Sequence, residues 1–171
     1  MFTLRCTQRL LARLKVDRTE LAVGEPTTLL GDWYANLLHI GRVQLVLAVS
    51  ERTFLPVVLP AAPVSSVVTH LHRGVGDVLR ALRLDAASID RELVEMGTLV
   101  LGRTASRQVT GILVDFAKGL ELYLEHEPSL LTCSVKFAKT PCSPLYKTTV
   151  TPESATAALF AQACTGATEV P

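Results

Sequence analysis

The sequence contains no long hydrophobic run and no excess of charge of either sign. It has 17 Lys and Arg residues against 16 Asp and Glu residues, a formal charge of +1. No segment reaches the roughly 18 consecutive apolar residues of a membrane span. Arg5, Arg9 and Arg13 interrupt the amino-terminal segment before it is long enough for the apolar part of a signal peptide. We therefore expect a cytosolic protein with no membrane association. The near-neutral charge also excludes a broad positive field for polyphosphates, so nucleic acid binding is not favoured and would need a local patch.

Cysteine and histidine spacings of metal sites are also missing. The sequence has four cysteines and no CxxC pair: Cys6, Cys133, Cys142 and Cys164. His70 and His72 are two residues apart, so on a helix they point about 200° away from each other and do not chelate one metal ion. We predict no metal and no cofactor. Reduced thiols are expected in a cytosolic protein, although Cys133 and Cys142 could still pair across the turn at Pro141.

The sequence motifs of common catalytic and nucleotide-binding sites do not occur. There is no HExxH, no GxSxG and no Gly-Lys-Ser/Thr ending of a phosphate-binding loop. The Gly-Val-Gly at residues 74–76 lies in a helical pattern and lacks the preceding strand of a dinucleotide site. An enzyme of these classes is therefore not indicated.

The hydrophobic content of 49% in 171 residues is enough for one globular domain, expected over residues 1–165 with a frayed tail at 166–171. Alternation and helical spacing predict a strand at the amino terminus, a short helix, and three strands between Trp33 and Leu59 joined by turns so short that neighbours must be antiparallel. Pro56 places the third of these at an edge or a bulge. Further helices are predicted at 64–84, 87–96, 106–126 and 153–164, and strands at 97–102 and 131–137. The fold class is α+β, a mainly antiparallel sheet with the long central helix packed on one face and the other helices around it.

The turn at residues 102–107, GRTASR, precedes the long helix. Free N–H groups at a helix start favour anions, and here Arg103, Thr104, Ser106 and Arg107 add positive charge and hydroxyl donors. Thr104 or Ser106 is equally what a helix uses as an N-cap. The turn thus predicts either a candidate anion site or an ordinary capped helix start.

A second group of residues lies four apart along one flank of this helix: Arg107, Gly111, Asp115 and Gly119. Each glycine costs roughly 1 kcal/mol of helix stability relative to alanine, which suggests close approach by a backbone or a ligand. Asp115 is the candidate catalytic base or metal ligand of this flank. Tight helix packing with a structurally paired Asp115 explains the same spacing.

Two polar residues accompany the predicted strand that starts at Trp33. Asn36 shares a strand face with apolar residues, so it must bond to a polar neighbour such as Asp115 or face a pocket. Asp32 forms a turn with Gly31, and we expect it on an exposed polar surface with Arg5, Arg103, Ser106 and Arg107. Glu51 and Arg52 are interpreted as an ordinary hairpin turn.

Four motifs carry a resemblance to a known family: FTLRCTQRLL at 2–11, LGDWYANLL at 30–38, QLVLAVSERTFLPV at 44–57 and GRTASRQVTGILVDF at 102–116. In these motifs, and as far as residues 140–145, the chain resembles a bacterial family described as a domain of unknown function. The family pattern has asparagine at the position of Ser50 and often lysine at that of Arg103. The resemblance implies a bacterial, soluble, single-domain protein and no particular reaction.

We therefore favour a non-catalytic binding or regulatory module, with a protein partner, in a bacterial stress, plasmid or defence context. The alternative is an enzyme acting on a phosphate-bearing small molecule or nucleic-acid end, with Arg103 and Arg107 neutralising phosphate and Asp115 as base or metal ligand. Direct nucleic acid binding would require five arginines on one face: Arg5, Arg9, Arg13, Arg103 and Arg107.

Overall fold

A computed structural model describes residues 1–124, 129–141 and 150–166. Five strands form one sheet: β1 (Phe2–Cys6), β2 (Trp33–Ile40), β3 (Val43–Ser50), β4 (Pro56–Pro60) and β5 (Leu99–Arg103). The helices are α1 (Gln8–Leu14), α2 (Val67–Ala81), α3 (Ala86–Glu95), α4 (Arg107–Leu124), α5 (Leu130–Ala138) and α6 (Pro152–Gly166), with short 3-10 helices η1 (Arg18–Glu20) and η2 (Val64–Ser66). The predicted α+β class is confirmed. Of the predicted tail, Gly166 ends α6, and 167–171 lie outside the described residues.

The strand order is β4-β3-β2-β1-β5. β2, β3 and β4 are antiparallel neighbours, as their short connections predict, and β4 with its Pro56 is an edge strand. β1 lies parallel to both β2 and β5. The sheet is therefore mixed: the pairs β2–β3 and β3–β4 are antiparallel, and the pairs β1–β2 and β1–β5 are parallel.

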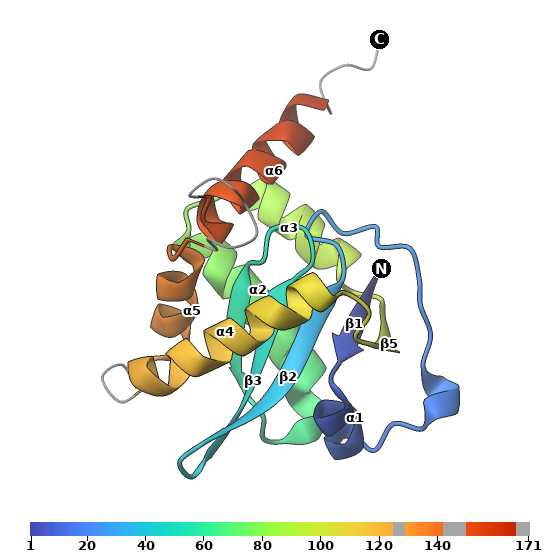
Figure 1. The fold of residues 1–171 in the computed structure, drawn as a ribbon. Helices are drawn as coiled ribbons and strands as arrows, with labels where there is room; N and C mark the ends of the chain where they lie inside the picture. The colour runs from blue at the N-terminus through green and yellow to red at the C-terminus, as the bar shows by residue number, and fades with distance from the viewer. Residues whose placement is uncertain (125–128, 142–149, 167–171) are drawn as a thin grey trace.

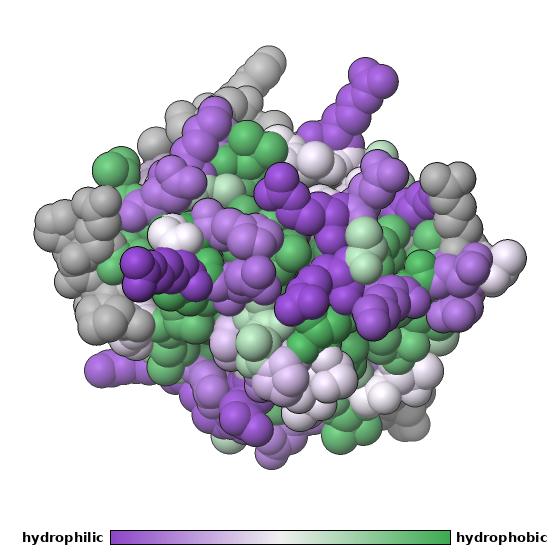
Figure 2. Space-filling model, turned by 90° about the horizontal axis from the view of Figure 1, so that it is seen from below, coloured by the Kyte–Doolittle hydropathy of each residue, from purple (hydrophilic) through white to green (hydrophobic). Residues whose placement is uncertain are grey.

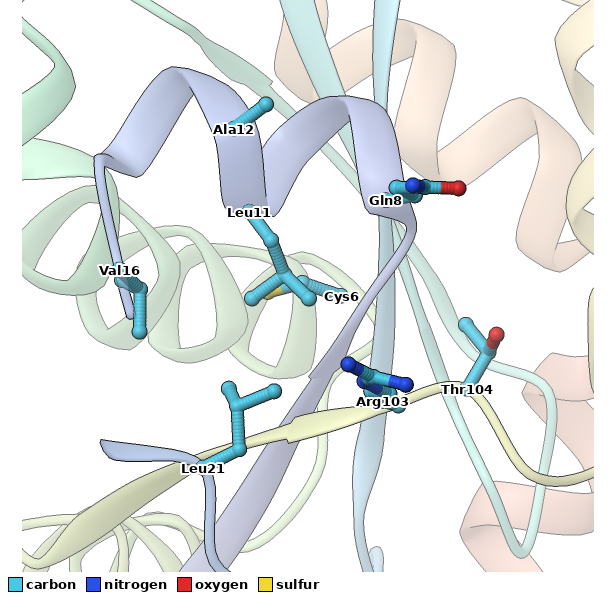
Figure 3. A pocket seen from close by; sticks show the side chains of 8 residues that line it. All are labelled: Cys6, Gln8, Leu11, Ala12, Val16, Leu21, Arg103 and Thr104. Carbon is cyan, nitrogen blue, oxygen red and sulfur yellow. The ribbon is translucent and has the colours of Figure 1, made fainter. Parts of the chain in front are cut away.

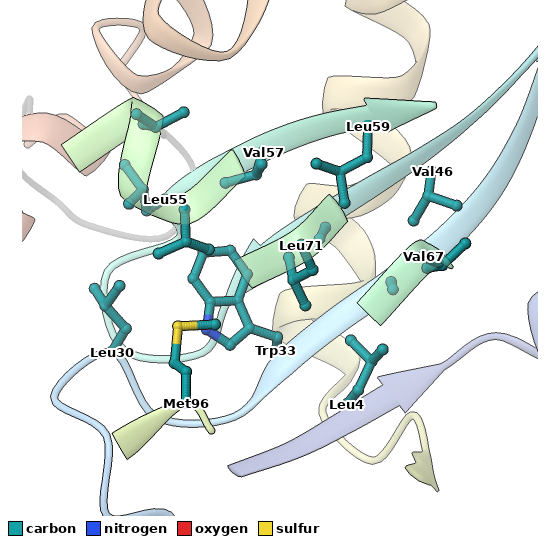
Figure 4. Packing of buried hydrophobic residues seen from close by; sticks show 14 of the residues in the cluster. Leu4, Leu30, Trp33, Val46, Leu55, Val57, Leu59, Val67, Leu71 and Met96 are labelled. Atoms are coloured by element: carbon teal, nitrogen blue, oxygen red, sulfur yellow. The ribbon is translucent and has the colours of Figure 1, made fainter. Parts of the chain in front are cut away.

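Helices cover both faces of the sheet (Figure 1). On one face, the apolar stripe of α4 packs with alternate side chains of β2, β3 and β4, and the buried helix residues are Val109, Ile112, Leu113, Phe116 and Leu120. Their i, i+3, i+4 spacing predicts this buried side. On the other face, α2 packs around Trp33 together with Leu4, Leu55 and Met96 (Figure 4). Leu10 of α1 belongs to this second core, so α1 and α4 lie on opposite faces.

The predicted strand at 131–137 is wrong, because this segment is helix α5. Ser129 accepts a hydrogen bond from the Thr132 N–H and caps the helix. Cys133 and Phe137 are four residues apart and both buried, which is helical spacing on one face. Ser134 of α5 also accepts the Val58 N–H at 2.9 Å and so satisfies a donor on the edge strand β4. The question of a Cys133–Cys142 pair lies outside the described residues, since Cys142 is not among them.

Candidate functional site

The predicted polar residues meet around Arg5, which is mostly buried in β1. Its guanidinium donates from Nε to Oδ2 of Asp32 at 2.8 Å, and Nη2 forms an ion pair with the same oxygen at 2.8 Å. Asp32 is only 2% exposed, and its other oxygen accepts the Thr3 N–H at 2.8 Å. The expectation that Arg5 and Asp32 lie on an exposed polar surface is therefore wrong. The parallel register puts Arg5 directly beside Tyr34 and Gly102, so the ion pair lies between neighbouring strands.

Arg5 and Tyr34 also connect this ion pair to the turn before α4. Arg5 Nη1 donates to the Arg103 carbonyl at 3.5 Å, and the guanidinium lies 5.9 Å from the centre of the Tyr34 ring. The Tyr34 hydroxyl donates to Glu51 Oε1 and accepts the Ser106 N–H, each at 3.2 Å. Glu51, interpreted from the sequence as an ordinary turn residue, thus helps to fix the start of α4.

Ser106 caps α4, so the turn forms the capped helix start that the sequence offered as one alternative. Its Oγ accepts the Val109 N–H at 3.3 Å, and its carbonyl accepts the Thr110 hydroxyl at 2.7 Å. The Ser106 side chain thus bonds to its own helix. Among the polar side chains of the turn, those of Arg103 and Thr104 line a pocket. Arg107 is exposed.

Asn36 and Asp115 are not brought together. Asn36 Oδ1 accepts the Thr7 hydroxyl at 2.9 Å, so the predicted bond to a polar side chain is present, but Asp115 as its partner is wrong. The Thr7 hydroxyl makes no side-chain cap to α1 and donates to Asn36 instead. The Asp115 side chain is 68% exposed and lies 4.0 Å from Lys118 on the same helix. Asp115 is therefore neither sealed in the core nor part of the pocket at Arg103.

The two glycines beside Asp115 have different surroundings. A Cβ at Gly119 would lie 2.9 Å from the Phe137 ring of α5, so close packing explains that glycine. A Cβ at Gly111 would have no neighbour within 4 Å. Close approach by a backbone therefore explains neither glycine: the alternative of tight packing holds at Gly119, and no described residue approaches closely at Gly111.

We expect Gly111→Ala to raise the free energy of unfolding by about 0.5–1 kcal/mol, because alanine loses less backbone freedom in a helix and nothing lies in its way. Gly119→Ala is the matched control and should destabilise the chain, since its Cβ meets Phe137. Urea unfolding of both variants measures the difference. Equal effects of the two substitutions would show that helix propensity alone governs both positions.

Two adjoining pockets lie at the carboxyl ends of β1 and β5, where Cys6 is the register partner of Arg103. They share Leu21, Arg103 and Thr104. The larger has a volume of about 520 Å³ and is lined by Cys6, Gln8, Leu11, Ala12, Val16, Leu21, Arg103 and Thr104 (Figure 3). The other, of about 370 Å³, extends past Arg5 and Gly102 to Val23. Of the predicted ligand residues, the structure brings Arg5, Arg103 and Thr104 to these pockets.

Gly102 allows the segment around Ala22 to form one wall of the pockets. The Ala22 N–H donates to the Leu101 carbonyl at 2.9 Å, so this segment runs along β5. A Cβ at Gly102 would lie 2.7 Å from Thr3 Cγ2 and 3.1 Å from the Ala22 carbonyl oxygen. Only glycine fits between β1 and this segment without displacing one of them.

The pocket lining has little capacity for acid–base or nucleophilic chemistry. Burial raises the pKa of the Cys6 thiol to about 12, so the thiol stays protonated at neutral pH and is a poor nucleophile. Among the described residues that line the two pockets there is no Asp, Glu or His. The described part of the chain also contains no cluster of three or more His, Cys, Asp or Glu side chains arranged for a metal ion. The arrangement provides a cation, a hydroxyl and an amide beside apolar side chains.

Sequence reasoning missed most of the residues that complete the pocket, among them Gln8, Leu11, Val16 and Leu21. Leu11 and Gln8 lie on a short helix and the other two in the long connection before β2, so no periodic pattern marks them as neighbours of Arg103. The parallel pairing of β1 with β5 is what brings them together.

Hydrophilic and hydrophobic residues are interspersed over the face seen from below (Figure 2). Of the five arginines that nucleic acid binding would require, Arg5 is paired with Asp32 and is not available to a phosphate backbone. In the ranges that the structure describes, no helix combines the length and the apolar character needed to cross a bilayer.

Residues 3–155 of the chain match the family described as a domain of unknown function (DUF6933). No curated protein and no solved structure matches the chain.

Proposed function

The chain belongs to the DUF6933 family, whose function is unknown, and we propose that it is a non-catalytic binding module that holds a small ligand at the carboxyl ends of β1 and β5. The position of the pocket carries this proposal. β1 and β5 are parallel neighbours, and after their carboxyl ends the chain continues to α1 on one face of the sheet and to α4 on the other. Ligands of sheets with parallel strands bind in the crevice that such a divergence leaves.

The size and support of the pocket agree with a binding role. Its volume of about 520 Å³ is within the range of small-molecule sites. The Arg5–Asp32 ion pair and the Tyr34 hydroxyl hold the strand ends and the turn before α4 in place, so the pocket is preformed. A preformed pocket loses little conformational entropy when it takes a ligand.

The lining favours binding over catalysis. The alternative enzyme mechanism assigns the base to Asp115, which lies exposed on α4 outside the pocket lining. Cys6, the one thiol among the described lining residues, has a pKa too high for a thiolate at neutral pH. A module of this kind would act in the cytosol and pass on ligand occupancy to a protein partner.

Filling the pocket tests the proposal. Ala12 is exposed on α1 and lines the pocket, so Ala12→Trp is expected to block it without entering the core. Ala158→Trp, at an exposed position of α6, is the matched control. Thermal-shift screening of the whole chain with small carboxylates, phosphates, sugars and amines should find ligands that raise Tm in the parent protein and in Ala158→Trp but not in Ala12→Trp. Shifts that persist undiminished in Ala12→Trp, or no ligand that raises Tm at all, would refute the binding site.

A further inference from the structure

The larger pocket has two chemically different ends. In Figure 3 the side chains of Leu11, Val16 and Leu21 surround one end, while Arg103 and Thr104 lie at the other, with Gln8 above them. The lining residues come from the end of β1, from α1 and the connection that follows it, and from the end of β5 and the residue after it. The separation of polar from apolar groups along one cavity indicates a ligand that is itself polar at one end.

The polar end carries a net positive charge. Arg103 is exposed and makes no ion pair in the described part of the chain, whereas the charge of Arg5 is already balanced by Asp32 at 2.8 Å. No carboxylate is present among the described lining residues to balance Arg103. The guanidinium offers up to five N–H donors in a planar arrangement that matches carboxylate or phosphate oxygens, and Thr104 adds a hydroxyl donor. This end therefore favours an anionic group.

The apolar end is aliphatic. Leu11, Val16 and Leu21 are each partly buried, and the described lining residues of both pockets include no Phe, Tyr or Trp. A nucleobase or other flat ring is typically held by stacking on an aromatic side chain, which this lining does not supply. A flexible alkyl chain needs only apolar surface, and this the three aliphatic side chains provide.

We infer that the ligand is a single-chain aliphatic amphiphile with an anionic head, its head on Arg103 and Thr104 and its tail along Leu11, Val16 and Leu21. The inference rests on the proposed function, because it specifies the ligand of that same pocket. An alkyl phosphate and a fatty carboxylate share the required chemistry. Arg103 is then the residue that determines specificity for the anion.

Calorimetric titration of the whole chain below micellar concentrations distinguishes the contributions of head and tail. The probes are octyl phosphate and nonanoate, with octanol as the neutral probe of similar tail and methyl phosphate as the head without the tail. We expect octyl phosphate or nonanoate to bind at least about tenfold more tightly than both octanol and methyl phosphate, since head and tail each contribute a contact worth roughly that factor. Whichever of the two anions binds more tightly identifies the head group.

Substitutions test which residues bind the head and which bind the tail of the ligand. Arg103→Gln should weaken binding of the preferred anion about tenfold or more and leave octanol unchanged, and Arg103→Lys should restore most of the loss. Arg42→Gln, at an exposed position in the turn between β2 and β3, is the control and should have no effect. Val16→Asn should weaken the octyl probes but not methyl phosphate.

Each contrary result has a separate meaning. Equal affinity for octanol and octyl phosphate would overturn the anionic head, and equal affinity for methyl and octyl phosphate would overturn the aliphatic tail. Absence of binding by both anions would overturn the whole inference. The proposed function would survive any of these results if ligands of another class still raise Tm in a manner that Ala12→Trp abolishes.

Discussion

Asp32→Ala is expected to lower the free energy of unfolding by about 3–5 kcal/mol, the largest effect of any single substitution that we predict. Asp32 is 2% exposed, accepts hydrogen bonds from the Thr3 N–H and from Arg5 Nε, and forms an ion pair with Arg5 Nη2 at 2.8 Å. Removing the carboxylate leaves the mostly buried Arg5 charge without a counter-ion and the Thr3 N–H without an acceptor. Both groups would then be desolvated without compensation.

Urea unfolding at neutral pH measures this effect, and Asp115→Ala is the matched control. The Asp115 carboxylate is 68% exposed and lies 4.0 Å from Lys118 on the same helix, so its removal should change the free energy of unfolding by less than about 0.5 kcal/mol. The double variant Arg5→Met, Asp32→Ala should be more stable than Asp32→Ala alone, because it removes the unpaired charge. Equal losses for the Asp32 and Asp115 variants would contradict a structural role for the ion pair.

Glu92→Gln is expected to cost about 1–3 kcal/mol. Glu92 of α3 is 1% exposed, and its two oxygens accept the N–H groups of Leu29 and Leu30 at 2.7 and 3.0 Å. These bonds fix the connection that leads into Asp32 and β2. Glutamine has one acceptor oxygen, so one of the two N–H groups would face an amide donor instead. Asp90→Asn, at an exposed position of the same helix, is the control and should have little effect.

The cost of Glu92→Gln should also depend on pH. Desolvation by burial raises the pKa of Glu92 above its ordinary value of 4.5, and this outweighs the lowering by its backbone hydrogen bonds and by Arg52. The folded chain therefore binds a proton at Glu92 more tightly than the unfolded chain does. As the pH falls through the raised pKa towards 4.5, protonation of Glu92 increases the free energy of unfolding of the parent protein. Glutamine does not titrate, so the stability difference between parent and variant should widen from neutral pH to about pH 4.5. A difference that narrows over this interval would contradict the assignment.

The antiparallel half of the sheet could be predicted from the sequence because the pairing of its strands follows from the short turns between them. Because the turns at Gly41 and after Ser50 are short, β3 must pair antiparallel with β2 and β4. Pro56 restricts β4 to an edge of the sheet. The buried stripe of α4 follows from residue spacing in the same way. These elements need no knowledge of distant segments.

The parallel pairing of β1 with β5, and hence the pocket, could not be predicted in this way. The two strands are more than ninety residues apart, and periodicity does not say which strands are neighbours. For the same reason, spacing on α4 drew attention to Asp115, whereas the carboxylate that pairs with Arg5 is Asp32. The segment 131–137 shows a further limit, since its seven residues, with Thr132, Val135 and Phe137 among them, fit a strand until Ser129 is recognised as a helix cap.

The most direct test of the ligand site is to map by NMR which backbone amides of the isotope-labelled whole chain respond to the ligands that raise its Tm. The site at the diverging ends of β1 and β5 predicts that the first amides to shift are those of Gln8, Leu21, Arg103 and Thr104. Responses confined to another cavity, such as the one lined by Ile40, Val43 and Leu130, with no change at Arg103, would contradict it.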